Sequence, residues 1–137
     1  MKLLIDSDVV FDVFQRRQPH YNASNAVLKI ARRGTVAGAV ASHTLANLFY
    51  MHGKPSLPFI GESLLPYIGV CAGDAHQTGV AMRAGMGDFE DALQAAAALE
   101  WKAAFIVTRN TKHYRKSPIP AITPKAWLNR FAPEITT

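Results

Sequence analysis

The chain has 137 residues, of which 49% are hydrophobic, and a formal net charge of +5. This length suits one domain spanning residues 1–137, and the basic balance favours a polyanionic partner such as nucleic acid, although it also suits a surface kept for solubility. No apolar run reaches the roughly 18 residues of a membrane span, the N-terminus lacks the pattern of a secretory signal, and the single cysteine excludes an internal disulfide, so we expect a protein of the reducing cytoplasm.

Short apolar runs alternate with amphipathic segments along the chain. Residues 2–5, an apolar run followed by polar residues, predict a buried strand, whereas apolar residues three and four apart predict helices. Asp8 or Ser7 is expected to cap the first helix. In chain order the pattern predicts a strand over 2–5, helices over 9–17 and 20–33, a strand over 36–41, a helix from 42 that includes 50, a short helix ending near 67, a strand over 68–72, helices over 74–84 and 88–100, strands over 103–107 and near 121–122, and a last helix over 124–131.

The alternation of strands with helices predicts an α/β fold, a three-layer α/β/α sandwich around a central, mainly parallel sheet. In such sheets, ligand sites collect beyond the carboxyl ends of the strands. Asp6, Ser42 and Thr108 fall at such ends. We therefore expect the functional site at this edge of the sheet.

Acidic residues are concentrated in two short stretches where a strand or loop meets a helix. The first stretch ends an apolar run with Asp6 and Asp8, and the second, with Asp88 and Asp91, opens an alanine-rich helix. A buried carboxylate is costly unless it is paired or bound to a metal, and magnesium needs only a few carboxylates. If Asp6 and Asp91 converge, a divalent cation would offset their repulsion and support a displacement at phosphorus.

Each acid also has a purely structural interpretation. Asp8 is equally suited to cap a helix, Asp88 to cap the helix that it begins, and Asp12 to lie exposed or in a salt bridge. Asp6 and Asp91 are explained least well in this way. Asp6 directly follows a core strand, and Asp91 precedes an unbroken apolar helix face.

Three motifs lie in a distinctive order along the chain. They are Leu4-Ile5-Asp6-Ser7-Asp8-Val9-Val10, Asp88-Phe89-Glu90-Asp91-Ala92-Leu93-Gln94-Ala95-Ala96 and Ile106-Val107-Thr108-Arg109-Asn110-Thr111-Lys112-His113-Tyr114. This order resembles that of a PIN domain, and the similarity is greatest to the small bacterial VapC-like toxins of toxin–antitoxin pairs with Asp-Phe-Glu-Asp and Thr-Arg-Asn motifs. The resemblance extends over nearly the whole chain.

The resemblance implies a compact α/β ribonuclease that uses acids to bind Mg²⁺ or Mn²⁺. By matching position, the catalytic acids and metal ligands would be Asp6, Asp88 and Asp91. Contributors around them would be Asp8, Thr108, Asn110 and His113. The implied partners are an RNA substrate and a cognate antitoxin protein. Dimers are common among similar proteins, although no residue of this chain identifies one.

Two positions depart from the family pattern. Asn47 stands where many relatives have a glutamate in the helix after the second strand. His113 replaces the acid of the usual Thr-Arg-Asn-x-x-Asp-Phe motif, and imidazole is a ligand that manganese or zinc accepts more readily than magnesium. We therefore expect a shifted metal preference or reduced activity, and we hypothesise that Asp8 restores part of the lost charge.

Basic residues crowd around the third motif. They are Arg109, Lys112, Arg115 and Lys116. The pairs Arg16-Arg17 and Arg32-Arg33 end predicted helices, where cations suit the helix dipole. The four residues around the third motif have no such explanation, and we expect them to contact RNA phosphates. His113 lies among them, and a phosphate contact is one role open to it, beside a surface or capping position and a role in the motif. Tyr114 is expected in the core rather than stacked on a base.

Three functions remain open. The first and favoured one is a metal-dependent ribonuclease that an antitoxin inhibits in an apolar groove. That groove would be lined by Phe11, Phe14, Phe49 and Tyr50, although each of these aromatic residues taken singly is better explained as part of the core. The second is a PIN-like module that has lost catalysis through His113 and only binds RNA or a partner. The third is a haloacid dehalogenase-like phosphatase with Asp6 as nucleophile and Asp8 as acid or base, although the usual Gly-Thr after the second acid is missing.

Overall fold

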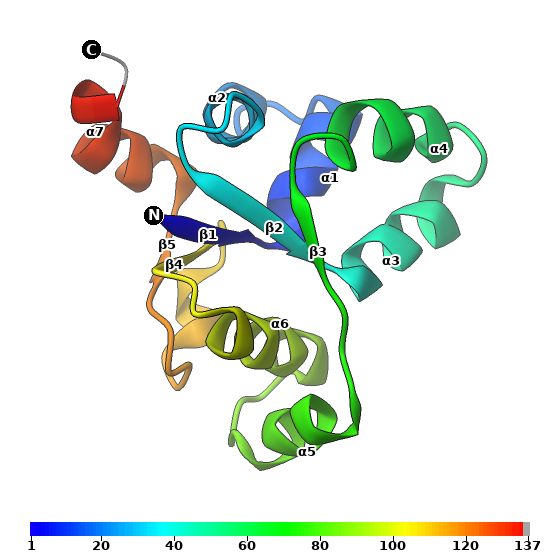
Figure 1. Cartoon of the computed structure of the whole chain (residues 1–137), viewed down its shortest axis with the longest axis vertical. Coiled ribbons are helices and arrows are strands. Elements are labelled where there is room, and N and C mark those ends of the chain that lie inside the picture. The colour runs from blue at the N-terminus through cyan, green and yellow to red at the C-terminus, as the bar shows by residue number, and fades with distance from the viewer. Residues whose placement is uncertain (136–137) are drawn as a thin grey trace.

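The computed structural model describes residues 1–135, which form a five-stranded parallel sheet with helices on both faces (Figure 1). The strands are β1 (Lys2–Ile5), β2 (Ala37–Ala41), β3 (Gly69–Cys71), β4 (Phe105–Val107) and β5 (Ala121–Ile122). Their order across the sheet is β3-β2-β1-β4-β5, and each neighbouring pair is parallel. The three-layer α/β/α sandwich expected from the sequence is therefore confirmed.

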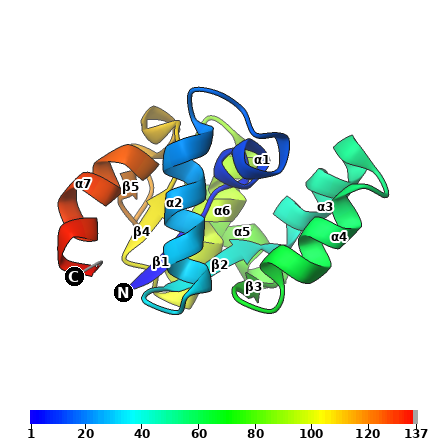
Figure 2. The ribbon, with the colours of Figure 1, turned by 90° about the horizontal axis from the view of Figure 1, so that it is seen from above.

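Helices cover the two faces of this sheet unequally. They are α1 (Ser7–Gln15), α2 (Tyr21–Arg32), α3 (Ser42–His52), α4 (Ser56–Pro58), α5 (Ala75–Arg83), α6 (Phe89–Trp101) and α7 (Pro124–Ile135), with a π-helical turn η1 (Phe59–Leu64) after α4 and a 3₁₀ turn η2 (Thr111–Tyr114) after β4. One face carries α1, α2 and α7, and the other carries α5 and α6 (Figure 1). Figure 2 shows that α3 and α4 extend to one side of the molecule.

The side chains of β1 divide the core into two parts. Leu3 and Ile5 are fully buried in the cluster formed with α1, α2 and α7, whereas Leu4 is fully buried against the alanines of α6. Gly38 in β2 lets α2 approach the sheet closely, because a Cβ at this position would lie 2.8 Å from the Cβ of Ala31. The central strand is thus fixed on both faces, and its carboxyl end has a defined position.

Three local predictions differ from the structure. α1 begins at Ser7, and its N-cap is Asp6, whose extended backbone and side-chain contact with the Ser7 N–H provide the cap. The apolar helix face expected after Asp91 does not reach the end of the helix, because the buried face of α6 follows Ala95 and Ala98 there and leaves Leu99 44% exposed. The short helix expected before β3 is the pair α4 and η1.

None of the helices within residues 1–135 is both long and apolar enough to cross a lipid bilayer.

Candidate active site

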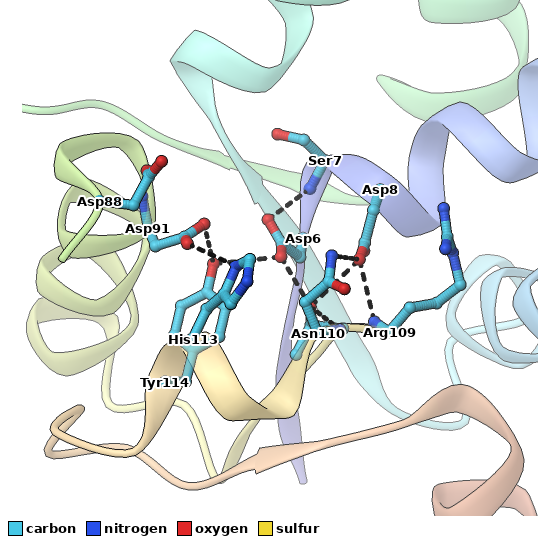
Figure 3. A network of polar contacts seen from close by, with 10 residues as sticks. Asp6, Ser7, Asp8, Asp88, Asp91, Arg109, Asn110, His113 and Tyr114 are labelled. Carbon is cyan, nitrogen blue, oxygen red and sulfur yellow. Dashed lines mark hydrogen bonds and ion pairs between the residues drawn. The ribbon is translucent and has the colours of Figure 1, made fainter. Parts of the chain in front are cut away.

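The carboxyl ends of β1 and β4 lie side by side, because Ile5 and Val107 are paired in register. Asp6 and Thr108 directly follow these residues, and the Asp6 N–H donates to the Val107 carbonyl oxygen at 2.9 Å. The first turn of α6 carries Asp91 toward the same edge, and η2 closes the site from below in Figure 3. The predicted location of the site is therefore where the polar side chains gather.

Asp6 lies at the centre of this network and is only 6% exposed. Its Oδ1 accepts a hydrogen bond from the Ser7 N–H at 2.7 Å. Its Oδ2 accepts from the Thr108 hydroxyl at 2.8 Å and from the Tyr114 hydroxyl at 3.1 Å. Burial, followed by the nearby charge of Asp8, raises the pKa of Asp6 to about 7. The site thus contains a carboxyl group that exchanges its proton near neutral pH when no cation is bound.

Asp91 faces Asp6 from α6. Its Oδ1 accepts from the Tyr114 hydroxyl at 3.2 Å, and its Oδ2 lies 3.1 Å from Nδ1 of His113. Burial, and then the charge of Asp88, raises the pKa of Asp91. Asp88 itself caps α6, with its Oδ1 accepting from the Asp91 N–H at 2.9 Å, and lies beyond Asp91 as seen from Asp6 in Figure 3.

Tyr114 joins the two acids through one hydroxyl group. Its ring is buried, with 3% exposed, and burial and the two carboxylates raise the pKa of the phenol well above its usual range, so the hydroxyl keeps its proton. One hydroxyl proton can serve only one of the two carboxylates at a time. The second contact is therefore favourable only if a carboxyl, such as that of Asp6, is itself protonated. Sequence reasoning placed Tyr114 in the core but missed this contact of its hydroxyl.

Asp8 is held on the other side of Asp6, away from Asp91 (Figure 3). Its Oδ2 accepts from the Arg109 N–H at 3.0 Å and from Nδ2 of Asn110 at 3.1 Å, and it lies 3.3 Å from the Thr108 hydroxyl. Its Oδ1 is buried without a hydrogen-bond partner, and burial raises the pKa of Asp8. Asp8 therefore fastens the turn after β4 to α1.

Arg109 is engaged in a partly buried ion pair. Its Nε donates to Asp12 Oδ2 at 2.7 Å and its Nη2 donates to Asp12 Oδ1 at 3.2 Å, while the Ser24 hydroxyl lies 3.3 Å from Oδ2. Asp12 is fully buried, so of the two positions predicted for it the salt bridge is confirmed and the exposed position is wrong. The guanidinium of Arg109 is largely used within the fold.

A second buried network fixes the helices around the acids, and sequence reasoning missed it. Nε2 of Gln94 on α6 donates to the hydroxyls of Ser7 on α1 and Thr44 on α3 at 3.1 and 3.0 Å, and these two hydroxyls lie 2.7 Å apart. Gln94 and Thr44 are fully buried. The only signal in the sequence is a polar residue among the inward-facing alanines of the helix.

Asn47 binds an acid from another helix. Its Nδ2 donates to Oε1 of Glu90 at 3.0 Å, and Nε2 of His43 lies 4.0 Å from the same oxygen. Burial lowers the pKa of His43, which favours the neutral imidazole. At the position where many relatives have a glutamate, this chain thus has an amide that holds a glutamate supplied by α6.

The carboxylate oxygens of Asp6 and Asp91 are suitable ligands for a divalent cation. Asp6 and Asp91 approach the same Tyr114 hydroxyl, and carboxylate oxygens are the ligands that Mg²⁺ and Mn²⁺ prefer. Within residues 1–135, no three side chains of the His, Cys, Asp and Glu types are placed to hold one ion together. Mg²⁺ usually keeps several waters and needs only one or two carboxylates. Asp88 would therefore take part only through water.

A cleft of about 620 Å³ opens beside the two acids of α6. Its lining consists of Gly85, Met86, Gly87, Asp88, Asp91, Lys112, His113, Arg115 and Lys116. The three basic side chains of this set are exposed, so they present positive charge to solvent next to the carboxylates. Three of the four basic residues singled out in the sequence thus lie together, and Arg109 does not line this cleft.

Known structures share this arrangement of strands and helices. FitAB bound to an IR36 DNA fragment matches with a TM-score of 0.70 at 17% identity, covering 89% of this chain and 94% of that chain. VapBC2 from Rickettsia felis, bound to a DNA fragment from its promoter, matches with a TM-score of 0.67 at 16% identity, covering 90% and 98%. FitAcB from Neisseria gonorrhoeae matches with a TM-score of 0.61 at 19% identity, also covering 90% and 98%.

Sequence comparison assigns the family. A search of curated proteins finds no match. A family model described as a PIN domain matches residues 2–112. Since this model spans the sheet from β1 to β4 and includes both facing acids, the chain belongs to the PIN domain family.

Proposed function

We propose that the chain is a metal-dependent ribonuclease and the toxin of a toxin–antitoxin pair. The observation that carries the proposal is the pair of carboxylates, Asp6 and Asp91, that face each other across the Tyr114 hydroxyl beside a cleft with a basic rim. Nuclease activity is general among PIN domains, so family membership supports a hydrolase acting on nucleic acid. The choice of RNA and of Mg²⁺ or Mn²⁺ is our proposal.

The side chains of the site have separable roles in this proposal. Asp6 and Asp91 would hold the cation, and Asp88 would hold one of its waters. Thr108 fixes Asp6 through its hydroxyl, and Asn110 fixes the turn through Asp8. A bound Mg²⁺ or Mn²⁺ supplies Lewis acidity and an activated water for displacement at phosphorus.

The RNA strand would follow the cleft. Lys112, Arg115 and Lys116 neutralise its phosphates, and the formal net charge of +5 favours its approach. Arg109 is not among these phosphate contacts, because its guanidinium is hydrogen-bonded to Asp12.

An antitoxin partner would cover part of the apolar surface of α3. Phe49, Tyr50 and Met51 are 44, 88 and 60% exposed, whereas Phe11 is buried and Phe14 packs against Phe59. The groove inferred from four aromatic residues is thus reduced to its α3 part. Structures of FitAB and VapBC2 share the fold, which supports a protein partner. We also propose a homodimer, from the family resemblance alone.

A second function is favoured by His113. It places an imidazole 3.1 Å from Asp91 where the family motif has an acid, which suits a PIN-like module that binds RNA without cleaving it. The haloacid dehalogenase-like alternative is wrong, because the PIN domain model matches residues 2–112, which include the first two motifs and the third as far as Lys112.

RNA cleavage by the purified protein, freed of any inhibitor, tests the proposal. We expect cleavage of a mixed RNA pool with Mg²⁺ or Mn²⁺, loss of cleavage with chelator, and loss of cleavage in Asp6→Asn and Asp91→Asn. Asp74→Asn is the matched control, because it makes the same change at the N-cap of α5 outside the site. A folded wild-type protein that cleaves nothing with either metal would replace the proposal with the binding-module function.

A further inference from the structure

The hydroxyl of Tyr114 occupies the space where Asp6 and Asp91 face each other. It lies 3.1 Å from Asp6 Oδ2 and 3.2 Å from Asp91 Oδ1. No other side chain in the described part of the chain forms hydrogen bonds with both carboxylates. Tyr114 stands where the usual Thr-Arg-Asn-x-x-Asp-Phe motif has Phe, a residue without a hydroxyl.

Tyr114 is held firmly in this position. Its ring belongs to the core cluster under the sheet together with Leu4, Ala95 and Ile106, and only 3% of the residue is exposed. Its backbone is fixed as well, because the Tyr114 carbonyl oxygen accepts from the Ser117 N–H at 3.0 Å at the end of η2. The hydroxyl can turn about its C–O bond, but the ring that carries it cannot leave without disturbing the core.

The hydrogen bonds leave few oxygen lone pairs between the acids. A carboxylate oxygen has about two acceptor sites, and both sites of Asp6 Oδ2 are used, one by Thr108 and one by Tyr114. On the opposite side, Asp91 Oδ1 faces Tyr114, and Asp91 Oδ2 faces His113. The two oxygens that face each other across the gap are therefore the ones engaged by the phenol.

From this geometry we propose that the Tyr114 hydroxyl competes with a divalent cation for the facing oxygens of Asp6 and Asp91, and so weakens cation binding at this site. The inference rests on the proposed function, since it concerns the same two carboxylates. Tyr114 acts on the acids and not on RNA, so it is a positioning residue. It joins the two acids when no cation is present, and its hydroxyl must give up its contacts with the facing oxygens when a cation arrives.

A substitution of Thr108 distinguishes competition between Tyr114 and the cation from mere support of the Asp6 side chain. It also donates to Asp6 Oδ2, but it approaches from the side of Asp8, since its hydroxyl lies 3.3 Å from Asp8 Oδ2. Removing this donor loosens Asp6 without freeing the lone pair that faces Asp91. Tyr114→Phe and Thr108→Val therefore change cation affinity in opposite directions if Tyr114 competes, and in the same direction if both residues merely support Asp6.

The test is a titration of the full chain with Mn²⁺ in the absence of RNA. Binding is measured by calorimetry and by the electron paramagnetic resonance signal of free Mn²⁺. We expect Tyr114→Phe to bind Mn²⁺ about tenfold more tightly than the wild type, the size of effect that one hydrogen bond to a charged group produces. Thr108→Val should bind more weakly, and Asp6→Asn should not bind. Tyr67→Phe, at a half-exposed tyrosine remote from the acids, is the matched control and should bind as the wild type does.

Each outcome decides the matter. Unchanged or weaker binding by Tyr114→Phe, or tighter binding by Thr108→Val of the same size, overturns the competition. Tighter binding by Tyr114→Phe in a protein that cleaves no RNA supports the role of Tyr114 and overturns the proposed function. Absence of Mn²⁺ binding by both the wild type and Tyr114→Phe overturns the two together. Thermal unfolding of Tyr114→Phe verifies that the variant is folded.

Discussion

At the scale of single residues, the burial of the ionised Asp6 carboxylate is electrostatically unfavourable. Its carboxyl is nearly fully buried next to Asp8, and the hydrogen bonds from Ser7, Thr108 and Tyr114 offset only part of that cost, since its pKa still lies well above the ordinary value. Carboxyl groups with pKa values raised by burial and a like charge are concentrated at functional sites. Because of this unfavourable burial, the free energy of unfolding should depend on pH.

Without metal, Asp6 should make the protein less stable as pH rises from about 4 to about 7. The pKa of Asp6 is raised from 3.8 to about 7 on folding, so over this window the folded state holds a proton that the unfolded state has lost. The free energy of unfolding therefore falls with pH and levels off above about 7. Asp8 and Asp91, whose pKa values are also raised, act in the same direction, whereas His43, whose pKa is lowered, acts in the opposite direction.

Asp6→Asn should remove the Asp6 part of this fall, because an amide does not titrate. Urea unfolding in the presence of chelator, at about pH 5 and about pH 8, measures the difference for both proteins. Asp74→Asn serves again as the control, because it makes the same change outside the site. An equally steep fall in Asp6→Asn would assign the effect to other groups.

At the scale of elements, α6 serves both the fold and the site through its first turn. Asp88 caps the helix, and three residues later Asp91 points toward Asp6. The cap fixes where the turn begins and thus where the Asp91 carboxylate lies. Structural and functional contributions of Asp88 therefore overlap, and only a substitution that keeps the cap can separate them.

Asp88→Ser should keep the stability of the protein and lower RNA cleavage. Serine is as good an N-cap as aspartate, so the free energy of unfolding should change little, whereas Asp88→Ala should cost about 1 kcal/mol. Loss of a carboxylate that holds a metal-bound water should lower cleavage about tenfold. Urea unfolding and initial cleavage rates measure the two effects. Full activity of Asp88→Ser would limit Asp88 to the cap.

The connection between β4 and η2 is anchored to α1 by the ion pair of Arg109 and Asp12. Arg109→Met should lower the free energy of unfolding by about 3–5 kcal/mol, because it leaves the fully buried Asp12 carboxylate without its main partner. Arg17→Met is the control: Arg17 lies 3.9 Å from the same acid with a partly exposed side chain, so its loss should cost about 1 kcal/mol or less. Equal effects of the two substitutions on urea unfolding would contradict this account.

At the scale of the whole molecule, the sequence was informative wherever a pattern is repeated along the chain. Apolar runs of strand length between amphipathic segments were enough to predict the parallel sheet, and the ends of β1 and β4 were enough to place Asp6 and Thr108 together. Contacts between single residues far apart were not predictable. Asp12 looks like a polar residue on a helix until Arg109, 97 residues away, is seen to pair with it. The direction of the Tyr114 hydroxyl depends on a short 3₁₀ turn without periodicity.

The distribution of charge over the molecule leads to the last prediction. Net positive charge alone would attract RNA to any face, whereas the cleft places Lys112, Arg115 and Lys116 beside the acids. For single-stranded RNA, the logarithm of the binding constant falls with the logarithm of salt concentration by about 0.7 for each phosphate neutralised. Lys112→Ala should therefore make this slope shallower by about 0.7.

The measurement is RNA binding by the Asp6→Asn protein, which binds without cleaving, across a series of salt concentrations. Lys54→Ala removes the same charge from an exposed lysine that does not line the cleft, and its slope should match that of Asp6→Asn alone. If the two lysine substitutions lower the slope equally, RNA is attracted by net charge and not by the cleft. If only Lys112→Ala lowers it, the phosphates of the bound strand lie beside Asp91, where the proposed cleavage requires them.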